Sequence, residues 1–187
     1  MNSALSIDKL QNIWQKVTVL HSGQTYGGRH KDEKIEYINH IGSVVFEVLN
    51  AAQHTANFNA ELAVSCALLH DSIEDTALTV EELKQLYGQQ VTAGVLALTK
   101  DKNKAKDEQM IDSLTRIKAQ PTEVWAVKLA DRICNLYAPP YYWNNEKKLS
   151  YLEEAKTIHG HLKDGNEYLA NRLMQKMEDY KKYLEQL

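Results

Sequence analysis

Apolar residues recur at helical spacing along almost the whole chain, and this pattern limits the fold more than any other feature. They stand three or four positions apart in segments such as 7–20, 37–52 and 121–133, whereas a half-buried strand would place them at every second position. Gly and Pro, which interrupt helices, number only eight and three among 187 residues. The sequence therefore predicts an all-α fold of about eight helices, forming a single domain over residues 1–187.

Polar residues in front of apolar runs predict where several helices begin. Asn59 is an N-cap candidate for a mostly buried helix. Thr79 with Glu82 three residues later forms a capping box, and Ser150 with Glu153 repeats that pattern. We therefore expect one helix to start after Thr79 and the seventh helix to start at Ser150.

The charge of the chain excludes a general attraction to polyanions. The formal net charge is −3 and the pI is near 6.2, so we expect no nucleic-acid or anionic-membrane partner, and any phosphate binding should come from a local basic patch. Such patches are the glycine-rich basic loop 23–31, with His21 just before it and His30 near its end, and the lysine-rich run 100–106. The lysine-rich run could instead be a solvated loop.

The location predicted from the sequence is the cytoplasm. Cys66 and Cys134 both lie in apolar helical patterns, which suits core residues in a reducing compartment better than a disulfide. The first ten residues lack the basic start and apolar block of a signal peptide. No apolar stretch is long enough to span a membrane.

The stretch 67–76 carries the chemistry. A helix that buries Leu68 and Leu69 carries the adjacent His70 and Asp71 inward, where unpaired charge costs several kcal/mol. A bound divalent cation removes that cost, so the His-Asp pair indicates half of a metal site. The Glu-Asp pair at 74–75, one turn further on, supplies acid/base groups or groups that support the ligands. The alternative is a helix end with solvated carboxylates.

Further metal ligands are offered by His40 and Asp131. Each lies in an apolar pattern, although His40 could be an ordinary helix-start histidine and Asp131 could pair with Arg132 or Lys128. Two imidazoles and two carboxylates suit Mn²⁺, Fe²⁺ or Zn²⁺ better than Ca²⁺. Asn135 stands four residues after Asp131, so both side chains share one helix face and point into the candidate site.

Together these motifs resemble one family, the HD-superfamily hydrolase domain of RelA/SpoT proteins, and especially the stand-alone small alarmone hydrolases similar to the metazoan SpoT homologue. The matching segments occur in family order and cover roughly residues 15 to 170. They are His21-Ser22-Gly23-Gln24, Tyr37-Ile38-Asn39-His40, Ala67-Leu68-Leu69-His70-Asp71-Ser72-Ile73-Glu74-Asp75-Thr76, Thr79-Val80-Glu81-Glu82-Leu83, Lys128-Leu129-Ala130-Asp131-Arg132 and Asn135-Leu136.

The resemblance implies an HD-type helical bundle that hydrolyses the 3′-pyrophosphate of guanosine alarmones, the nucleotides of the stringent response, to GDP or GTP plus pyrophosphate. It implies that one metal ion, usually Mn²⁺, is bound by His40, His70, Asp71 and Asp131. It implies that Glu74 and Asp75 position and deprotonate the attacking water. The substrate contacts that it implies are Arg29, Asn135, Lys102, Lys147 and Tyr151.

Departures from the family pattern gather around the base-binding loop. His30 follows Arg29 where lysine is common, and Glu36 and Ile41 stand where prolines are common. These differences bear on purine preference more than on catalysis. A related phosphohydrolase that acts on ppApp or on the 2′-phosphate of NADPH is therefore an alternative.

A catalytically silent nucleotide sensor is an alternative from another class, and the intact Glu74-Asp75 pair argues against it. No synthetase domain is expected after Leu187, so only the hydrolytic direction is expected. The aromatic cluster 141–143 fits an interface slightly better than a lid, and a homodimer is compatible with that assignment.

Overall fold

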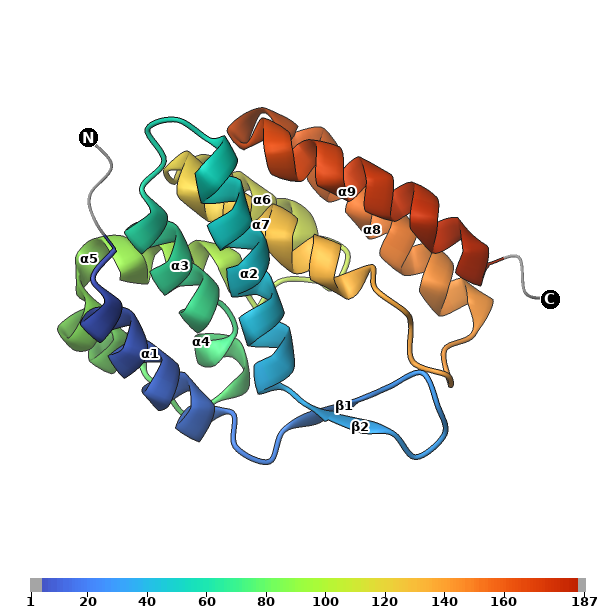
Figure 1. Cartoon of the computed structure of the whole chain (residues 1–187), viewed down its shortest axis with the longest axis horizontal. Coiled ribbons are helices and arrows are strands. Elements are labelled where there is room, and N and C mark those ends of the chain that lie inside the picture. Colours follow the sequence, from blue (N-terminus) through green and yellow to red (C-terminus); the bar gives the residue numbers. More distant parts are fainter. Residues whose placement is uncertain (1–4, 185–187) are drawn as a thin grey trace.

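The computed structural model describes residues 5–184 and confirms the all-α prediction, with a small β-hairpin added (Figure 1). The helices of the described part are α1 (Ile7–Leu20), α2 (Ile38–His54), α3 (Ala60–Leu69), α4 (Ser72–Asp75), α5 (Val80–Leu98), α6 (Gln109–Lys118), α7 (Thr122–Asn135), α8 (Asn145–Leu162) and α9 (Glu167–Tyr180), with 3₁₀ turns η1 (Lys163–Gly165) and η2 (Lys181–Tyr183). The hairpin consists of β1 (Thr25–Gly27) and β2 (Lys34–Glu36).

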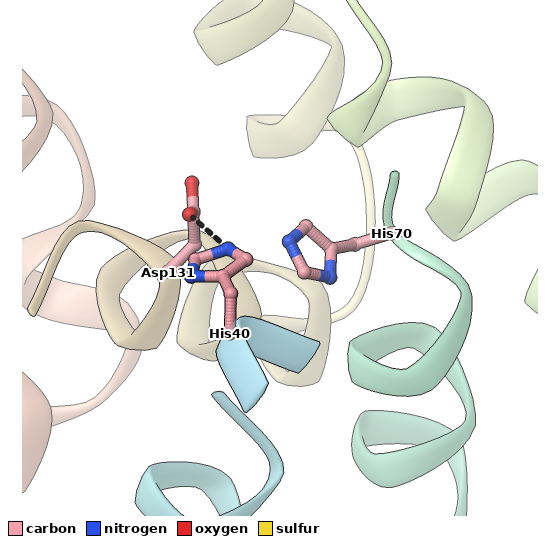
Figure 2. Close-up of side chains that lie close together, drawn as sticks. All are labelled: His40, His70 and Asp131. Atoms are coloured by element: carbon pink, nitrogen blue, oxygen red, sulfur yellow. Dashed lines mark ion pairs between the residues drawn. The ribbon is translucent and has the colours of Figure 1, made fainter. Parts of the chain in front are cut away.

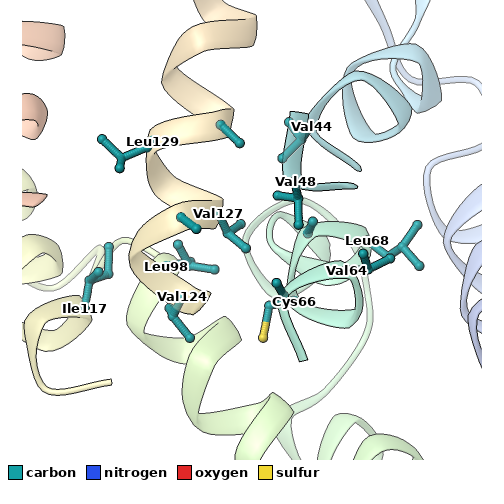
Figure 3. Close-up of a cluster of buried hydrophobic side chains, with 14 of the residues drawn as sticks. Val44, Val48, Val64, Cys66, Leu68, Leu98, Ile117, Val124, Val127 and Leu129 are labelled. Atoms are coloured by element: carbon teal, nitrogen blue, oxygen red, sulfur yellow. The ribbon is translucent and has the colours of Figure 1, made fainter. Parts of the chain in front are cut away.

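Helix α7 lies in the middle of the bundle. It packs against α2 and α3 on one side and against α8 and α9 on the other. Because it is surrounded, most of its residues are buried, including the charged Lys128, Asp131 and Arg132. Valine and leucine side chains from α2, α3 and α7 form the core beside it (Figure 3). The functional residues of α7 are therefore fixed by packing on several sides.

Two of the three predicted helix starts are confirmed. The Asn59 side chain accepts a hydrogen bond from the Leu62 N–H at 3.1 Å, and Thr79 forms the capping box of α5. The prediction that the seventh helix starts at Ser150 is wrong, because α8 already begins at Asn145. The Asn144 side chain caps it by accepting from the Lys147 N–H at 2.9 Å.

The glycine-rich loop is an antiparallel hairpin that leads directly into α2. Tyr26 pairs with Ile35 in its ladder. The segment between α7 and α8 lies against the hairpin, and its Tyr141 N–H donates to the Gly28 carbonyl at 3.1 Å. A Cβ on Gly27 would lie 2.5 Å from the Tyr142 ring, so only glycine permits this approach.

Both cysteines are free thiols, as predicted, and Cys66 lies in the core. Among residues 5–184, no helix combines the length and the hydropathy needed to cross a bilayer.

Candidate metal and catalytic site

Three side chains from separate helices meet beside α7 (Figure 2). His40 comes from the first turn of α2, His70 from the residue after α3, and Asp131 from α7. One potential ligand atom from each lies within 4.8 Å of the others. His40 Nε2 is 3.4 Å from Asp131 Oδ1. The structure thus brings together three residues that the sequence marked as metal ligands from segments far apart.

The hydrogen bonding of His70 fits a metal ligand. Its Nδ1 lies 2.8 Å from the Ala67 carbonyl oxygen, which can only accept, so Nδ1 is the donor. Its Nε2 is buried and has no hydrogen-bond partner within residues 5–184. An imidazole that donates from one nitrogen and leaves the other free is the arrangement that holds a metal. The residues present therefore fit a divalent cation.

Asp71 lies beside both histidines. Its Oδ2 is 3.0 Å from His70 Nε2, without hydrogen-bond geometry, and 3.8 Å from His40 Nε2. The same oxygen accepts a hydrogen bond from the Tyr37 hydroxyl at 2.5 Å. Asp71 is not part of the three-residue group within 4.8 Å, so it borders the cluster rather than completing it.

Asp131 is held from two sides. Lys128 Nζ lies 2.9 Å from its Oδ2, and Asn135 Nδ2 donates to its Oδ1 at 2.6 Å. Arg132 turns away, with Nη2 2.7 Å from Glu154 Oε2. Of the two pairing partners considered for Asp131, only Lys128 contacts it.

The buried charges stabilise one another. Burial lowers the pKa of His70, but the Asp71 carboxylate more than offsets this and raises it to about 9. Burial raises the pKa of Asp71, and the His70 charge brings it well below its usual range. For Asp131, burial is likewise outweighed, chiefly by Lys128, and the pKa is lowered. Burial and the Asp71 charge raise the pKa of Tyr37 far above its usual range, so Tyr37 stays a donor.

The two proposed catalytic carboxylates lie on α4, directly after Asp71. The Asp75 N–H donates to the Asp71 carbonyl at 2.9 Å, which sets the two residues one turn apart. Burial and the charges of Asp71 and Glu74 raise the pKa of Asp75 above that of an ordinary aspartate, which makes it a stronger base. Glu74 accepts from the Lys100 N–H at 3.1 Å.

The predicted substrate contacts fall into separate groups. Asn135 touches Asp131 and so lies at the cluster, whereas Lys102 Nζ donates to the Glu74 carbonyl at 3.0 Å and so lies beside the proposed catalytic carboxylates. Lys147 Nζ lies 4.8 Å from the centre of the Tyr151 ring.

Arg29 lies at the hairpin turn, where its Nη2 donates to the Tyr183 hydroxyl at 2.9 Å. Tyr37, three residues before His40, also lies at the cluster, and the sequence alone predicts no role for it.

The comparisons with known proteins identify relatives over most of the chain, although no family model matches it. The guanosine-3′,5′-bis(diphosphate) 3′-pyrophosphohydrolase MESH1 of Danio rerio is 32% identical over 153 residues, covering 79% of this chain and 82% of the relative. The Homo sapiens MESH1 is 32% identical over 151 residues, covering 78% and 82%. A solved structure, described as a metazoan ortholog of SpoT that hydrolyses ppGpp, matches with a TM-score of 0.78 at 25% identity, covering 97% of this chain and 99% of the other.

Proposed function

The chain belongs to the family of the MESH1 guanosine-3′,5′-bis(diphosphate) 3′-pyrophosphohydrolases, and on this premise we propose that it hydrolyses the 3′-pyrophosphate of ppGpp and pppGpp. The products are GDP or GTP and pyrophosphate. The observation that carries this proposal is the buried group of His40, His70 and Asp131, with a free His70 Nε2, in a chain of this family.

A single divalent cation would be held by His40, His70, Asp71 and Asp131. The two imidazoles and the carboxylates form a mixed N/O set that suits Mn²⁺, with Fe²⁺ and Zn²⁺ as alternatives. Such an ion, when bound, supplies a Lewis acid that acidifies water and polarises a phosphoryl oxygen. His70 would offer Nε2 to the ion, because its Nδ1 donates to the Ala67 carbonyl.

Asp75 would take the proton from the attacking water. Its raised pKa makes it a stronger base than an ordinary aspartate. Glu74 would orient that water. The water oxygen then forms a bond to the phosphorus next to the ribose, the bond from that phosphorus to the 3′ oxygen breaks, and the 3′ oxygen takes up a proton. Pyrophosphate leaves intact.

Local positive charge would offset the charge of the substrate, which the acidic chain as a whole cannot do. Lys102 lies at Glu74 and would face the transferred pyrophosphate. Lys147 and Tyr151 pack on each other and would contact the other phosphates or the ribose. Asn135 would contact the sugar or a phosphate, and Arg29 would pack against the purine.

Pyrophosphate release from purified protein with Mn²⁺ tests the proposal. We expect release from ppGpp, and no release from an Asp71→Ala variant that remains folded. Asp164→Ala, at an exposed carboxylate, is the matched control and should keep full activity. Release of pyrophosphate from ppApp alone, or of orthophosphate from NADPH alone, would keep the metal chemistry but refute guanosine specificity. Mn²⁺ binding without turnover of any of the three would favour the nucleotide-sensor alternative.

We further propose that the protein works in the cytoplasm. Free thiols at Cys66 and Cys134 are compatible with a reducing compartment.

A further inference from the structure

We propose that Tyr37 positions Asp71 for cation binding and that the turn His21–Gln24 holds Tyr37 and Asp75 in place. The inference rests on the proposed function, because it concerns the same site. The sequence singled out residues 21–24 as a motif, and neither metal binding nor catalysis accounts for them. We call Tyr37 together with residues 21–24 the buttress.

Tyr37 contacts two of the proposed ligands with one side chain. Its hydroxyl donates to Asp71 Oδ2 at 2.5 Å, and this oxygen is the one that faces both histidines. Its ring packs against the His40 ring, with centroids 5.5 Å apart. Tyr37 directly precedes α2, so the residue that orients Asp71 also packs on the ligand in the first turn of that helix.

Asp71 is the ligand that most needs such support. Its side chain is 22% exposed, against 4% for His70, 11% for His40 and 10% for Asp131. It also stands at the break between α3 and α4, whereas Asp131 lies within a buried helix. A carboxylate that is less enclosed has more orientations to lose when it binds an ion. The hydrogen bond from Tyr37 already restricts the Asp71 carboxylate before the ion binds, so less conformational entropy is lost on binding.

His21 supports Tyr37 from behind. The two rings are stacked, with centroids 5.2 Å apart and planes 24° apart, and His21 is almost fully buried. His21 Nδ1 lies 2.7 Å from Gln24 Oε1. The other end of the Gln24 amide donates to the Asp75 carbonyl at 2.8 Å, so Oε1 is the acceptor and His21 the donor.

Gln24 closes the arrangement through its backbone. Its carbonyl accepts from the Tyr37 N–H at 2.8 Å, while its side chain holds the carbonyl of Asp75. One residue of the hairpin entry thus fixes both the tyrosine that orients Asp71 and the main chain of the proposed base. The buttress therefore contacts both the proposed ligand Asp71 and the proposed base Asp75 from outside α4.

Mn²⁺ binding to a Tyr37→Phe variant tests the role of the hydroxyl without any substrate. Calorimetry, with the electron paramagnetic resonance signal of free Mn²⁺ as a second readout, should show a dissociation constant raised about 10–100-fold, the usual effect of removing a hydrogen-bond partner of a ligand. At saturating Mn²⁺, kcat should recover most of its value. Tyr168→Phe is the control. It removes a tyrosine hydroxyl that accepts a hydrogen bond from the Asn50 side chain, and it should leave the dissociation constant for Mn²⁺ unchanged.

A second variant tests the turn and covers the case in which Tyr37→Phe does not fold, as judged by circular dichroism. Gln24→Leu removes the contacts to His21 and Asp75 at a half-buried position, and should weaken Mn²⁺ binding less than Tyr37→Phe while lowering kcat at saturating Mn²⁺.

Unchanged Mn²⁺ affinity in folded Tyr37→Phe would overturn the positioning role, and unchanged affinity and kcat in Gln24→Leu would overturn the role of the turn. If the unmodified protein bound no Mn²⁺, the proposed function itself would fail.

Discussion

Replacing Lys128 with methionine should destabilise the protein by an amount that depends on cation binding. Lys128 Nζ lies 2.9 Å from Asp131 Oδ2, and only 11% and 10% of the two side chains are exposed. Methionine keeps most of the apolar stem and removes the charge. Removing one partner of a buried ion pair costs about 3–5 kcal/mol. We expect the lower end of this range, because Asn135 still donates to Asp131.

A bound cation should reduce this loss. Without Lys128, the Asp131 carboxylate has lost its nearest positive charge, and a divalent ion beside it replaces that charge. The positive charge of Lys128 would also repel a cation at Asp131, so its removal should tighten Mn²⁺ binding. Lys128→Met should therefore gain more stability from Mn²⁺ than the unmodified protein does. An ion at 100 times its dissociation constant stabilises a protein by about 2.7 kcal/mol, and a tighter-binding variant gains more at the same concentration.

Urea unfolding followed by circular dichroism measures both effects, once in excess EDTA and once in saturating Mn²⁺. Lys156→Met is the matched control, because its partner Glu153 is 2.7 Å away but both side chains are mostly exposed. Such a pair contributes at most about 1 kcal/mol. Equal losses for Lys128→Met in EDTA and Mn²⁺, or a loss in EDTA no larger than that of the control, would refute the reasoning.

Protons should compete with the cation at His70. Burial lowers the pKa of His70, but the Asp71 carboxylate more than offsets this and raises it to about 9. Since a ligating imidazole must be neutral, Mn²⁺ affinity should rise with pH up to about 9, with proton release visible by calorimetry in buffers of different ionisation enthalpy; a flat profile would contradict this. Gly94→Ala places a Cβ 2.8 Å from Cys66 Sγ and 3.0 Å from Val124 Cγ2 and should lower the free energy of unfolding by about 1–3 kcal/mol. Gly160→Ala on α8 meets open space and should raise it by about 0.5–1 kcal/mol in the same urea assay.

The helices could be predicted because their causes are local. Asn59 and Thr79 cap helices with side chains that reach only three residues along the chain. The failure at Ser150 has a local reason too. A Ser and a Glu three residues apart also share one face inside a helix, and the Ser150 hydroxyl there contacts Glu154 instead. The sequence predicts a loop where the hairpin lies, because strands of three residues each are too short to show alternation.

The candidate ligands could be predicted because each is a charged or polar group in an apolar run, which is anomalous without a partner. The groups that hold them carry no such mark. Tyr37 contacts Asp71 across 34 positions of sequence, and Gln24 contacts Asp75 across 51. A tyrosine before a helix or a glutamine in a turn is ordinary in either setting, so only the packing of the helices reveals these contacts.

The charges at the site balance without a cation, and this determines which variants remain folded. When His70 is protonated, its charge and that of Lys128 offset the charges of Asp71 and Asp131. If Asp71 is removed, His70 can lose its proton at little cost near pH 7, because an ordinary histidine pKa is about 6.5. If Lys128 is removed, Asp131 keeps the hydrogen bond from Asn135 but loses its nearest positive charge, which costs about 3 kcal/mol, the lower end of the range for a broken buried pair. Loss of turnover in Asp71→Ala therefore reports on the chemistry of the site, whereas the effect of Lys128→Met appears first in the stability of the fold.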